Sequence, residues 1–284
     1  MKISNLNYIV LFSFLSLLFS SCEKEAKNVD VPVVQPQLVV AGFLSPSAEP
    51  TKVVLSWSAP IYHNTHHDKP MESNAKVFIS DGANEYQLTY NSMKEYYSIS
   101  KANMPVVVGK KYSLRVESDR SKTLTSESFV PSSPDYSIQY LGKDSVKDEY
   151  DNNVYYRRYF LKLKINNSEP TAFYRIKAWQ QVIVYGNEQI EPMYMNIEDN
   201  MIVHGDVEKT IILEDYRMMH MSVTKQIYIN LEKVDETYYR YHNALSHYQG
   251  VDIFTEPTLV YSNVENGLGV FCSYHSVMDS VVVK

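Results

Sequence analysis

Three histidines and one aspartate fall within six positions of this chain, in the run His-Asn-Thr-His-His-Asp at residues 63–68. Imidazole and carboxylate groups are common ligands of zinc, copper and nickel. The run lies between predicted strands, and a loop would let His63, His66, His67 and Asp68 converge on one ion. Spacing within a polar loop fixes no geometry, so an exposed loop without a function is the alternative.

A second group combines sulfur and imidazole in the later half of the chain. Its members are Met193, Met195, Met201, His204, Met218, Met219, His220 and Met221. Thioether and imidazole ligands together suit monovalent copper, which is a soft ion. Methionine is also an adaptable packing residue, and strand alternation separates Met219 and Met221 from Met218 and His220, which favours packing.

Signatures of enzyme active sites are missing from the sequence. It has no nucleophile elbow, no His-Glu-x-x-His, no glycine-rich phosphate loop and no paired-cysteine metal knuckle. Adjacent carboxylates occur at Glu198-Asp199 and Glu214-Asp215, and a glycosidase needs two carboxylates. Solvated turns explain these pairs better. The sequence therefore predicts that the protein is not an enzyme, with no catalytic residue and no cofactor.

Tyrosine is the most over-represented residue, with 24 copies in the 284-residue chain. The run Tyr155, Tyr156, Arg157 and Arg158 has the composition of a contact surface, because tyrosine and arginine are enriched at protein interfaces. In a strand, half of these side chains would face inward, so packing is the alternative for them.

The start of the chain has the layout of a lipoprotein signal. Lys2 precedes an apolar run from Ile9 to Phe19, and two serines then lead to Cys22. Such a run is too short for a membrane-spanning helix and is typical of a cleaved signal peptide. We therefore expect residues 1–21 to be removed and Cys22 to be acylated, for example with palmitate. An ordinary signal peptide with an incidental cysteine is the alternative.

Composition narrows the class of protein further. The formal net charge is −6 and no basic stripe is visible, which argues against nucleic-acid binding. If Cys22 is acylated, Cys272 is the only other cysteine and no internal disulfide is possible. Residues 22–36 mix charges with two prolines and no strand or helix period, so we expect an anchor and linker there.

The chain from residue 37 to residue 131 predicts an immunoglobulin-like β-sandwich. Seven short apolar runs with strand alternation follow one another there, separated by turn residues. Residues 135–284 predict a second β-rich domain, in which Tyr159, Leu161, Leu163 and Ile165 form the buried face of one long strand. One helix is expected at residues 235–249, capped by Asp235. The predicted fold class is thus mainly β.

Several stretches resemble one uncharacterised family of bacteroidotal lipoproteins, the DUF4249 family. The resemblance rests on the Ser-Cys-Glu-Lys-Glu start at residues 21–25, the run Leu38 to Leu44, residues 108–114, and the C-terminal stretch 256–271 with its Asn266-Gly267-Leu268-Gly269 turn. The glycines suit a turn with positive φ. The acidic residues that follow Cys22 are also similar to signals for export to the cell surface, although a solvated linker explains them equally.

The resemblance implies a lipid-anchored protein of the outer membrane, with possible exposure at the cell surface. It implies a binding or accessory protein that partners a TonB-dependent outer-membrane receptor in nutrient or metal uptake, and it carries over no catalytic residue. Two other hypotheses remain open from the residues themselves. One is a copper- or zinc-handling lipoprotein that uses the run at residues 63–68. The other, least favoured, is a surface hydrolase.

Overall fold

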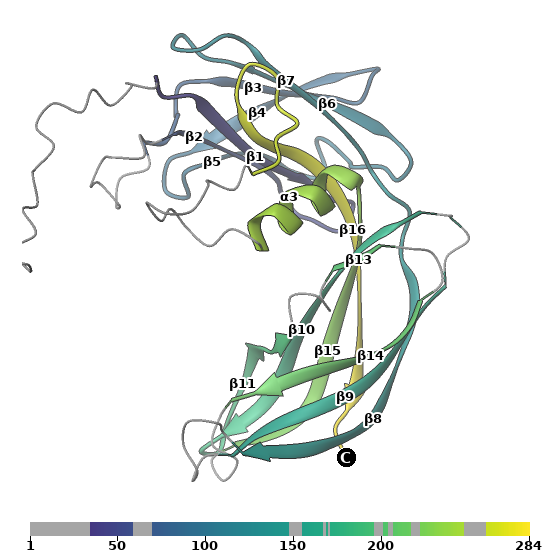
Figure 1. Cartoon of the computed structure of the whole chain (residues 1–284). Helices are drawn as coiled ribbons and strands as arrows, with labels where there is room; N and C mark the ends of the chain where they lie inside the picture. Colours follow the sequence, from purple (N-terminus) through teal and green to yellow (C-terminus); the bar gives the residue numbers. More distant parts are fainter. Residues whose placement is uncertain are drawn as a thin grey trace, which may run out of the picture. The chain divides into compact units, whose positions relative to one another are not determined.

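The computed structural model describes residues 35–58, 70–147, 155–166, 169, 171–195, 201–203, 207–216, 222–246 and 260–284 (Figure 1). Backbone contacts separate residues 1–35 from a unit that runs from Pro36 to Lys284. Cys22, the signal segment 1–21 and the histidine run at residues 63–68 lie outside the described residues. The described part is built from strands and one helix, α3, as the sequence predicts.

Seven strands form the first sandwich. They are β1 (Leu38–Leu44), β2 (Thr51–Trp57), β3 (Lys76–Ser80), β4 (Glu85–Asn91), β5 (Tyr96–Ile99), β6 (Lys111–Glu117) and β7 (Leu124–Phe129). One sheet has the order β1-β2-β5 and the other β4-β3-β6-β7, while the end of β4 also pairs with β5. Two antiparallel sheets connected in this order are the immunoglobulin-like arrangement that the sequence predicts.

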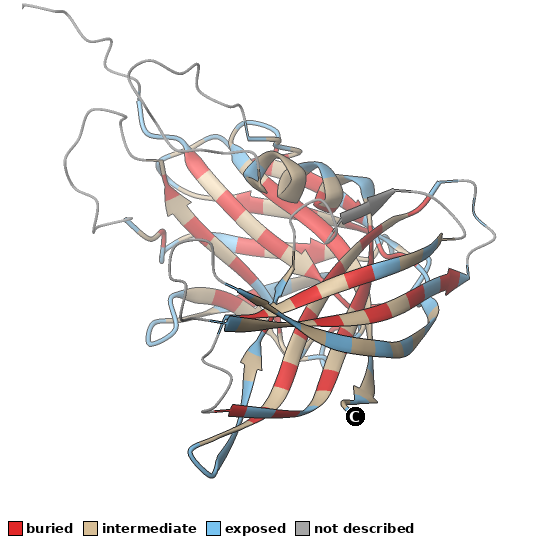
Figure 2. Cartoon of the chain, turned by 60° about the horizontal axis from the view of Figure 1, so that its bottom comes forward, coloured by how far each residue is buried: buried red, intermediate tan, exposed pale blue. Residues whose placement is uncertain are grey.

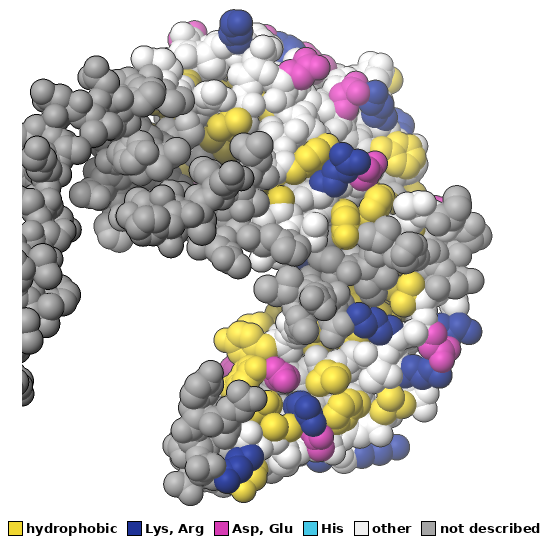
Figure 3. All heavy atoms as spheres, viewed as in Figure 1, with side chains coloured by type: hydrophobic (Ala, Val, Ile, Leu, Met, Phe, Trp, Pro, Cys, Tyr) yellow, Lys and Arg dark blue, Asp and Glu magenta, His cyan; other side chains and the backbone are white. Residues whose placement is uncertain are grey.

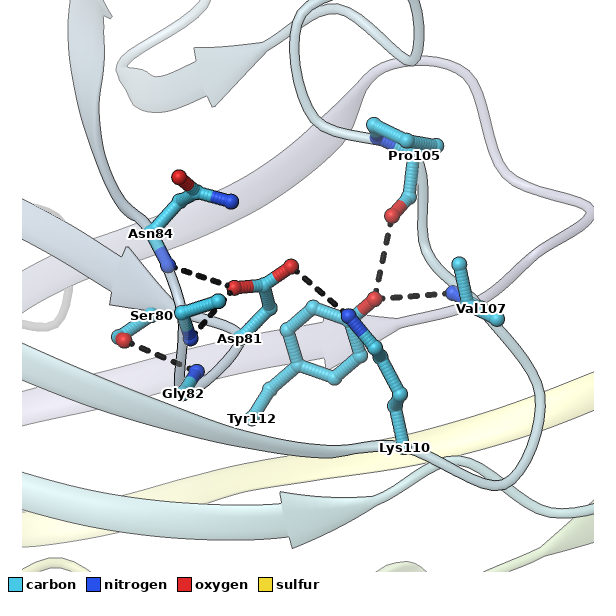
Figure 4. Close-up of polar contacts among 9 residues, drawn as sticks. Ser80, Asp81, Gly82, Asn84, Pro105, Val107, Lys110 and Tyr112 are labelled. Carbon is cyan, nitrogen blue, oxygen red and sulfur yellow. Dashed lines mark hydrogen bonds and ion pairs between the residues drawn. The ribbon is translucent and has the colours of Figure 1, made fainter.

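A buried tyrosine fixes the crossing between β5 and β6 (Figure 4). The hydroxyl of Tyr112 donates to the carbonyl of Pro105 at 3.1 Å and accepts the backbone N–H of Val107 at 2.9 Å. Such a tyrosine corner is typical of immunoglobulin-like sandwiches. Beside it, Asp81 accepts two N–H groups of the β3–β4 turn and the Lys110 ammonium at 2.9 Å. These hydrogen bonds lower the pKa of Asp81 to about 2.

Nine strands form the second set. They are β8 (Asp135–Lys147), β9 (Tyr155–Asn166), β10 (Phe173–Val184), β11 (Asn187–Pro192), β12 (Tyr194–Met195), β13 (Met201–Val203), β14 (Val207–Asp215), β15 (Ser222–Val234) and β16 (Leu268–Val282). They make one sheet of order β12-β14-β9-β8 and one of order β11-β10-β15-β16, with β13 also on β10.

The two sheets of the second set enclose an apolar core. Tyr159, Leu161, Leu163 and Ile165 on β9 are all buried, so the predicted inward face of this strand is confirmed. Side chains of β10, β14 and β15 complete the core. Buried and more exposed residues alternate along these strands (Figure 2), as expected for strands with one face on a core.

Strand β16 belongs to both sandwiches. Leu268 to Ser273 pair in parallel with β1, whereas Tyr274 to Val282 pair antiparallel with β15. Phe271 and Val264 pack in the core of the first sandwich. The predicted division into residues 37–131 and 135–284 stays a prediction. Residues 268–273, which it places in the second domain, pair with β1 of the first sandwich, and Val270 and Cys272 pack with Tyr238 of α3.

Two glycines let β16 approach β1 closely. Gly269 has a φ of 98°, and a Cβ added there would lie 1.9 Å from the carbonyl oxygen of Val40. A Cβ on Gly42 would lie 2.9 Å from the Phe271 ring. Asn266, with a φ of 60°, makes the turn that precedes the strand. The positive φ expected at Gly269 is confirmed. Gly267 does not have a positive φ; the preceding residue, Asn266, has it instead.

Helix α3 (Glu236–Ser246) begins at the predicted cap. Asp235 Oδ1 accepts the N–H of Tyr238 at 2.7 Å, and its Oδ2 accepts the hydroxyl of Ser128 at 2.7 Å and the N–H of Ser273 at 2.9 Å. One carboxylate therefore joins the helix to β7 and β16. The predicted helix end at residues 247–249 lies outside the described residues.

The inner face of α3 covers charged side chains as well as rings. Glu232, which is 2% exposed, accepts hydrogen bonds from the Lys177 ammonium at 2.5 Å and the Tyr238 hydroxyl at 2.8 Å. Arg175 donates to the same hydroxyl at 2.9 Å. Burial, with help from Arg175 and Lys177, lowers the pKa of His242 to about 3, which keeps its imidazole neutral.

The close approach at Gly269 predicts a large effect of one added methyl group. Gly269→Ala should lower the free energy of unfolding by at least about 3 kcal/mol, because the methyl group meets backbone atoms that cannot move aside. Gly82→Ala is the matched control, since Gly82 has a φ of 89° and open space around it, so only the conformational cost of about 1 kcal/mol applies. Urea unfolding measures both, and equal losses would contradict the contact with Val40.

The environment of Asp235 predicts a pH dependence of stability. Burial raises its pKa to about 6 despite the hydrogen bonds that it accepts. A carboxyl whose pKa is higher in the folded than in the unfolded chain stabilises the fold below pH 3.8, and this contribution disappears as the pH rises through about 6. Wild type should therefore lose about 2 kcal/mol relative to Asp235→Asn between pH 4 and pH 7. Parallel stability profiles for the two proteins would refute this.

Candidate functional site at the tyrosine-rich end of the second sandwich

The predicted contact run lies at the start of β9. Tyr156 and Arg158 point to the outer face of the sheet, because they alternate with the buried Tyr159. Tyr155 and Arg157 lie on the inner side, at the open end of the sandwich. The Arg157 guanidinium donates to the Ser222 hydroxyl of the facing sheet at 3.4 Å. The structure thus divides the run between two faces, as strand alternation requires.

Three tyrosines form a row on the outer face, namely Tyr156 of β9, Tyr194 of β12 and Tyr216, which directly follows β14. The rings of Tyr156 and Tyr216 are 4.9 Å apart between centroids, and those of Tyr194 and Tyr216 are 5.5 Å apart. Tyr194 is 67% exposed and Tyr216 is 52% exposed. In Figure 3, hydrophobic side chains gather over this sheet. We call Tyr156, Tyr194 and Tyr216 the tyrosine row.

Arg158 lies next to the tyrosine row in a fixed orientation. Its Nε donates to Asp144 Oδ1 at 3.0 Å and its Nη2 to Asp144 Oδ2 at 2.6 Å, across β9 and β8. This pair raises the pKa of Arg158 and lowers that of Asp144. The guanidinium carbon is 5.6 Å from the Phe160 ring centroid. A planar cation held in this way presents its remaining N–H groups to a partner.

A buried chain of hydrogen bonds supports this end from below. The Tyr159 hydroxyl donates to Thr224 at 2.8 Å, and the Thr224 hydroxyl donates to Gln180 at 2.6 Å. Tyr159 belongs to one sheet, whereas Thr224 and Gln180 belong to the other. The chain therefore ties the two sheets together beneath the exposed tyrosines, and it restricts the strands that carry the row.

The structure describes only part of the predicted metal sites. His63, His66, His67 and Asp68 lie outside the described residues. No group of three or more histidine, cysteine, aspartate or glutamate side chains within the described ranges could hold a metal ion. Met193 is buried and Met195 packs against the same core, as the packing alternative expects.

The remaining members of the sulfur-imidazole group cannot be placed. Met218, Met219, Met221, His204 and His220 lie outside the described residues, and the side chain of Met201 is not described. The pair Glu198-Asp199 is also outside. Asp215 is buried, whereas the adjacent Glu214 accepts the Tyr216 hydroxyl, so these two carboxylates do not share one face.

Tyr194 and Tyr216 are the site residues that sequence reasoning missed. Tyr194 lies in a strand of two residues and Tyr216 follows the last residue of β14. Only the pairing of Tyr194 with Glu214, and of Glu214 with Arg158, brings these side chains beside Tyr156. A single sequence carries no signal for such a register.

Comparison with known proteins identifies the family. The model of a family described as "Domain of unknown function (DUF4249)" matches residues 25–280, which is most of the chain. The chain belongs to the DUF4249 family. No curated protein matches this DUF4249 chain.

A similar solved structure is a two-domain fibronectin type-III segment from chicken tenascin. It is 12% identical, covers 87% of this chain and 99% of its own, and has a TM-score of 0.21. A score this low carries no argument, so the assignment of the first sandwich of this DUF4249 protein rests on its own strand order. Among the described residues, no helix has the length and apolar character needed to cross a membrane.

The buried chain under the tyrosine row predicts a stability difference between two tyrosines. Tyr159→Phe should lower the free energy of unfolding by about 1 to 2 kcal/mol, because Thr224 loses a buried hydrogen-bond partner. Tyr155→Phe is the control, since this side chain is 46% exposed and should change stability by less than about 0.5 kcal/mol. Urea unfolding followed by circular dichroism compares them, and an unchanged Tyr159→Phe midpoint would contradict the role of the hydroxyl.

Proposed function

We propose that this DUF4249 chain is a lipid-anchored binding or accessory protein of the outer envelope. In this proposal it partners a TonB-dependent outer-membrane receptor in nutrient or metal uptake. The observation that carries the proposal is the tyrosine row beside Arg158, a surface in which exposed rings and a fixed guanidinium lie together. The family membership and the lipoprotein-like start of the chain support it.

The composition and support of this surface fit a protein partner. Tyrosine and arginine are enriched among residues that dominate binding energy, because each combines a large apolar area with hydrogen-bonding groups. A tyrosine side chain has few rotatable bonds, so ordering it on binding costs little entropy. The hydrogen bonds of Arg158 to Asp144 and of Tyr159 to Thr224 reduce that cost further.

Anchoring fits the same proposal. Acyl chains on Cys22 would hold the chain at a membrane, since each buried methylene contributes about 0.8 kcal/mol. The segment between Cys22 and β1 would span roughly 50 Å if fully extended. A tethered protein meets a membrane receptor at a high effective concentration, so a modest docking surface is sufficient.

The metal-handling alternative depends on His63, His66, His67 and Asp68, which lie outside the described residues. Elemental analysis of metal-loaded, dialysed protein decides it, because a working site would retain copper or zinc in stoichiometric amounts. The hydrolase alternative would require turnover of a glycan or peptide that disappears with a single carboxylate substitution.

Docking through the tyrosine row predicts a loss of partner capture. The double variant Tyr194→Ser, Tyr216→Ser should capture at least about tenfold less β-barrel receptor from detergent extracts than the wild type does, because the interface loses two exposed rings. Phe129→Ser is the control, since this exposed ring lies on β7 of the first sandwich. Quantitative mass spectrometry of the captured proteins measures the change. Equal capture by the two variants would contradict docking at this end.

Acylation at Cys22 predicts a change of location that is independent of docking. Cys22→Ser removes the thiol and should move the protein from the membrane pellet to the soluble fraction. Cys272→Ser is the control, because its thiol is buried in the fold. Sedimentation of Cys22→Ser with membranes in undiminished amount would refute the anchor.

A further inference from the structure

A groove crosses the outer face of the first sandwich. It has a volume of about 710 Å³ and runs over β3, β6 and β7 to residues 263–265 and the first turn of α3. Clefts of this volume are in the range of small-molecule sites. In the view of Figure 3, acidic and basic side chains lie close together over the part of the first sandwich with β6 and β7.

Hydroxyl groups make up much of the lining. Ser80, Ser113, Thr125, Ser126 and Thr237 line the groove, and Leu114 is its only aliphatic lining residue. A hydroxyl can both donate and accept a hydrogen bond. The groove therefore offers neutral hydrogen-bonding groups beside apolar surface of similar extent.

Most charges in the groove are already paired and held in place. Arg115 donates to both carboxylate oxygens of Glu85, at 3.2 and 2.8 Å, and also to Glu117. Its guanidinium carbon lies 4.1 Å from the Phe78 ring centroid, which fixes the plane of the group. Glu127 forms an ion pair with Lys111. These paired side chains are held in place as hydrogen-bonding groups, and their opposite charges largely compensate each other within the groove.

Glu265 is positioned differently from the other lining acids. Its Oε2 accepts the Thr125 hydroxyl at 3.0 Å, and its backbone N–H donates to the carbonyl of Thr125 at 2.9 Å. No ion pair of Glu265 occurs among the described residues. Its carboxylate retains acceptor capacity and lies in the same groove as the hydroxyls of Ser113 and Thr125.

This chemistry disfavours several ligand classes. Glu85 and Glu127 are paired with Arg115 and Lys111, and the additional carboxylate of Glu265 disfavours an anion. A wholly apolar ligand would cover the lining hydroxyls and carboxylates without giving them hydrogen-bond partners, which costs free energy. An extended peptide could not add to the edge of β7 there, because Thr125 already pairs with Glu265 and the carbonyl of Glu127 already accepts the Asn263 amide.

From this lining we infer that the groove binds a neutral oligosaccharide. Sugar hydroxyls donate and accept in closely spaced pairs, which matches a carboxylate and neighbouring protein hydroxyls. Glu265 would accept from two adjacent sugar hydroxyls, and Ser113 and Thr125 would contact the ring substituents. The inference uses residues of the first sandwich and the segment that closes it, so it does not depend on docking by the tyrosine row.

Titration of the full lipidated chain in detergent with uncharged hexasaccharides tests the inference. The probes are hexamers of glucose, mannose, xylose and N-acetylglucosamine, and saturation-transfer NMR and calorimetry report binding. We expect at least one probe to bind with a dissociation constant of about 10 μM to 1 mM. Glu265→Gln should weaken that binding about tenfold and Ser113→Trp should abolish it.

Two controls separate loss of binding from loss of fold. Ser98→Trp places the same ring on β5, outside the groove, and should leave the dissociation constant unchanged. The urea midpoint is measured for every variant. If Ser113→Trp unfolds, Glu265→Gln still tests the inference, because glutamine has nearly the same shape as glutamate. Absence of binding by all four hexasaccharides, or binding unaffected by Glu265→Gln, would overturn the inference. Preference for a lysine-rich peptide instead, with steep salt dependence, would also overturn it.

Discussion

The parallel pairing of β16 with β1 is the constraint on which the two sandwiches depend. This pairing brings Phe271 into the first core, and the same strand then continues into antiparallel pairing with β15. It is possible only because the backbone at Gly269 passes within contact distance of Val40. The chain forms no disulfide from Cys272, which is a free buried thiol, so backbone pairing and packing hold these elements together.

Asp235 and the helix extend this constraint to a third element. The carboxylate joins α3 to Ser128 of β7 and Ser273 of β16, while the inner face of the helix covers Glu232 and Tyr238. Buried charges in such a cluster are costly unless each is paired. Lys177 pairs with Glu232 between β10 and β15, whereas Tyr238 of the helix donates to Glu232 and accepts from Arg175. A shift of α3 would therefore remove the Tyr238 hydroxyl from both charged groups, which makes the position of the helix specific.

Sequence patterns predicted local structure well, but they did not predict pairing between strands that are distant in the sequence. Alternation in β9 and the capping aspartate at residue 235 identified a strand face and a helix start, because both depend on neighbours in sequence. The parallel contact of β16 with β1 joins residues more than 200 positions apart, and no periodic pattern of hydrophobic residues predicts such a contact. Likewise, Tyr156 and Arg158 were predicted as contacts, but Tyr194 and Tyr216 join them only through strand register.

The measurement that tests the shared strand most directly uses the two tryptophans, one in each sandwich. Trp57 lies on β2 and Trp179 on β10, so Trp57→Phe and Trp179→Phe each leave one fluorescent reporter. If β16 joins both cores, the two reporters should show the same urea midpoint, and the Cys272 thiol should become reactive at that midpoint. Two separate transitions, or a reactive thiol while both reporters remain folded, would contradict the account.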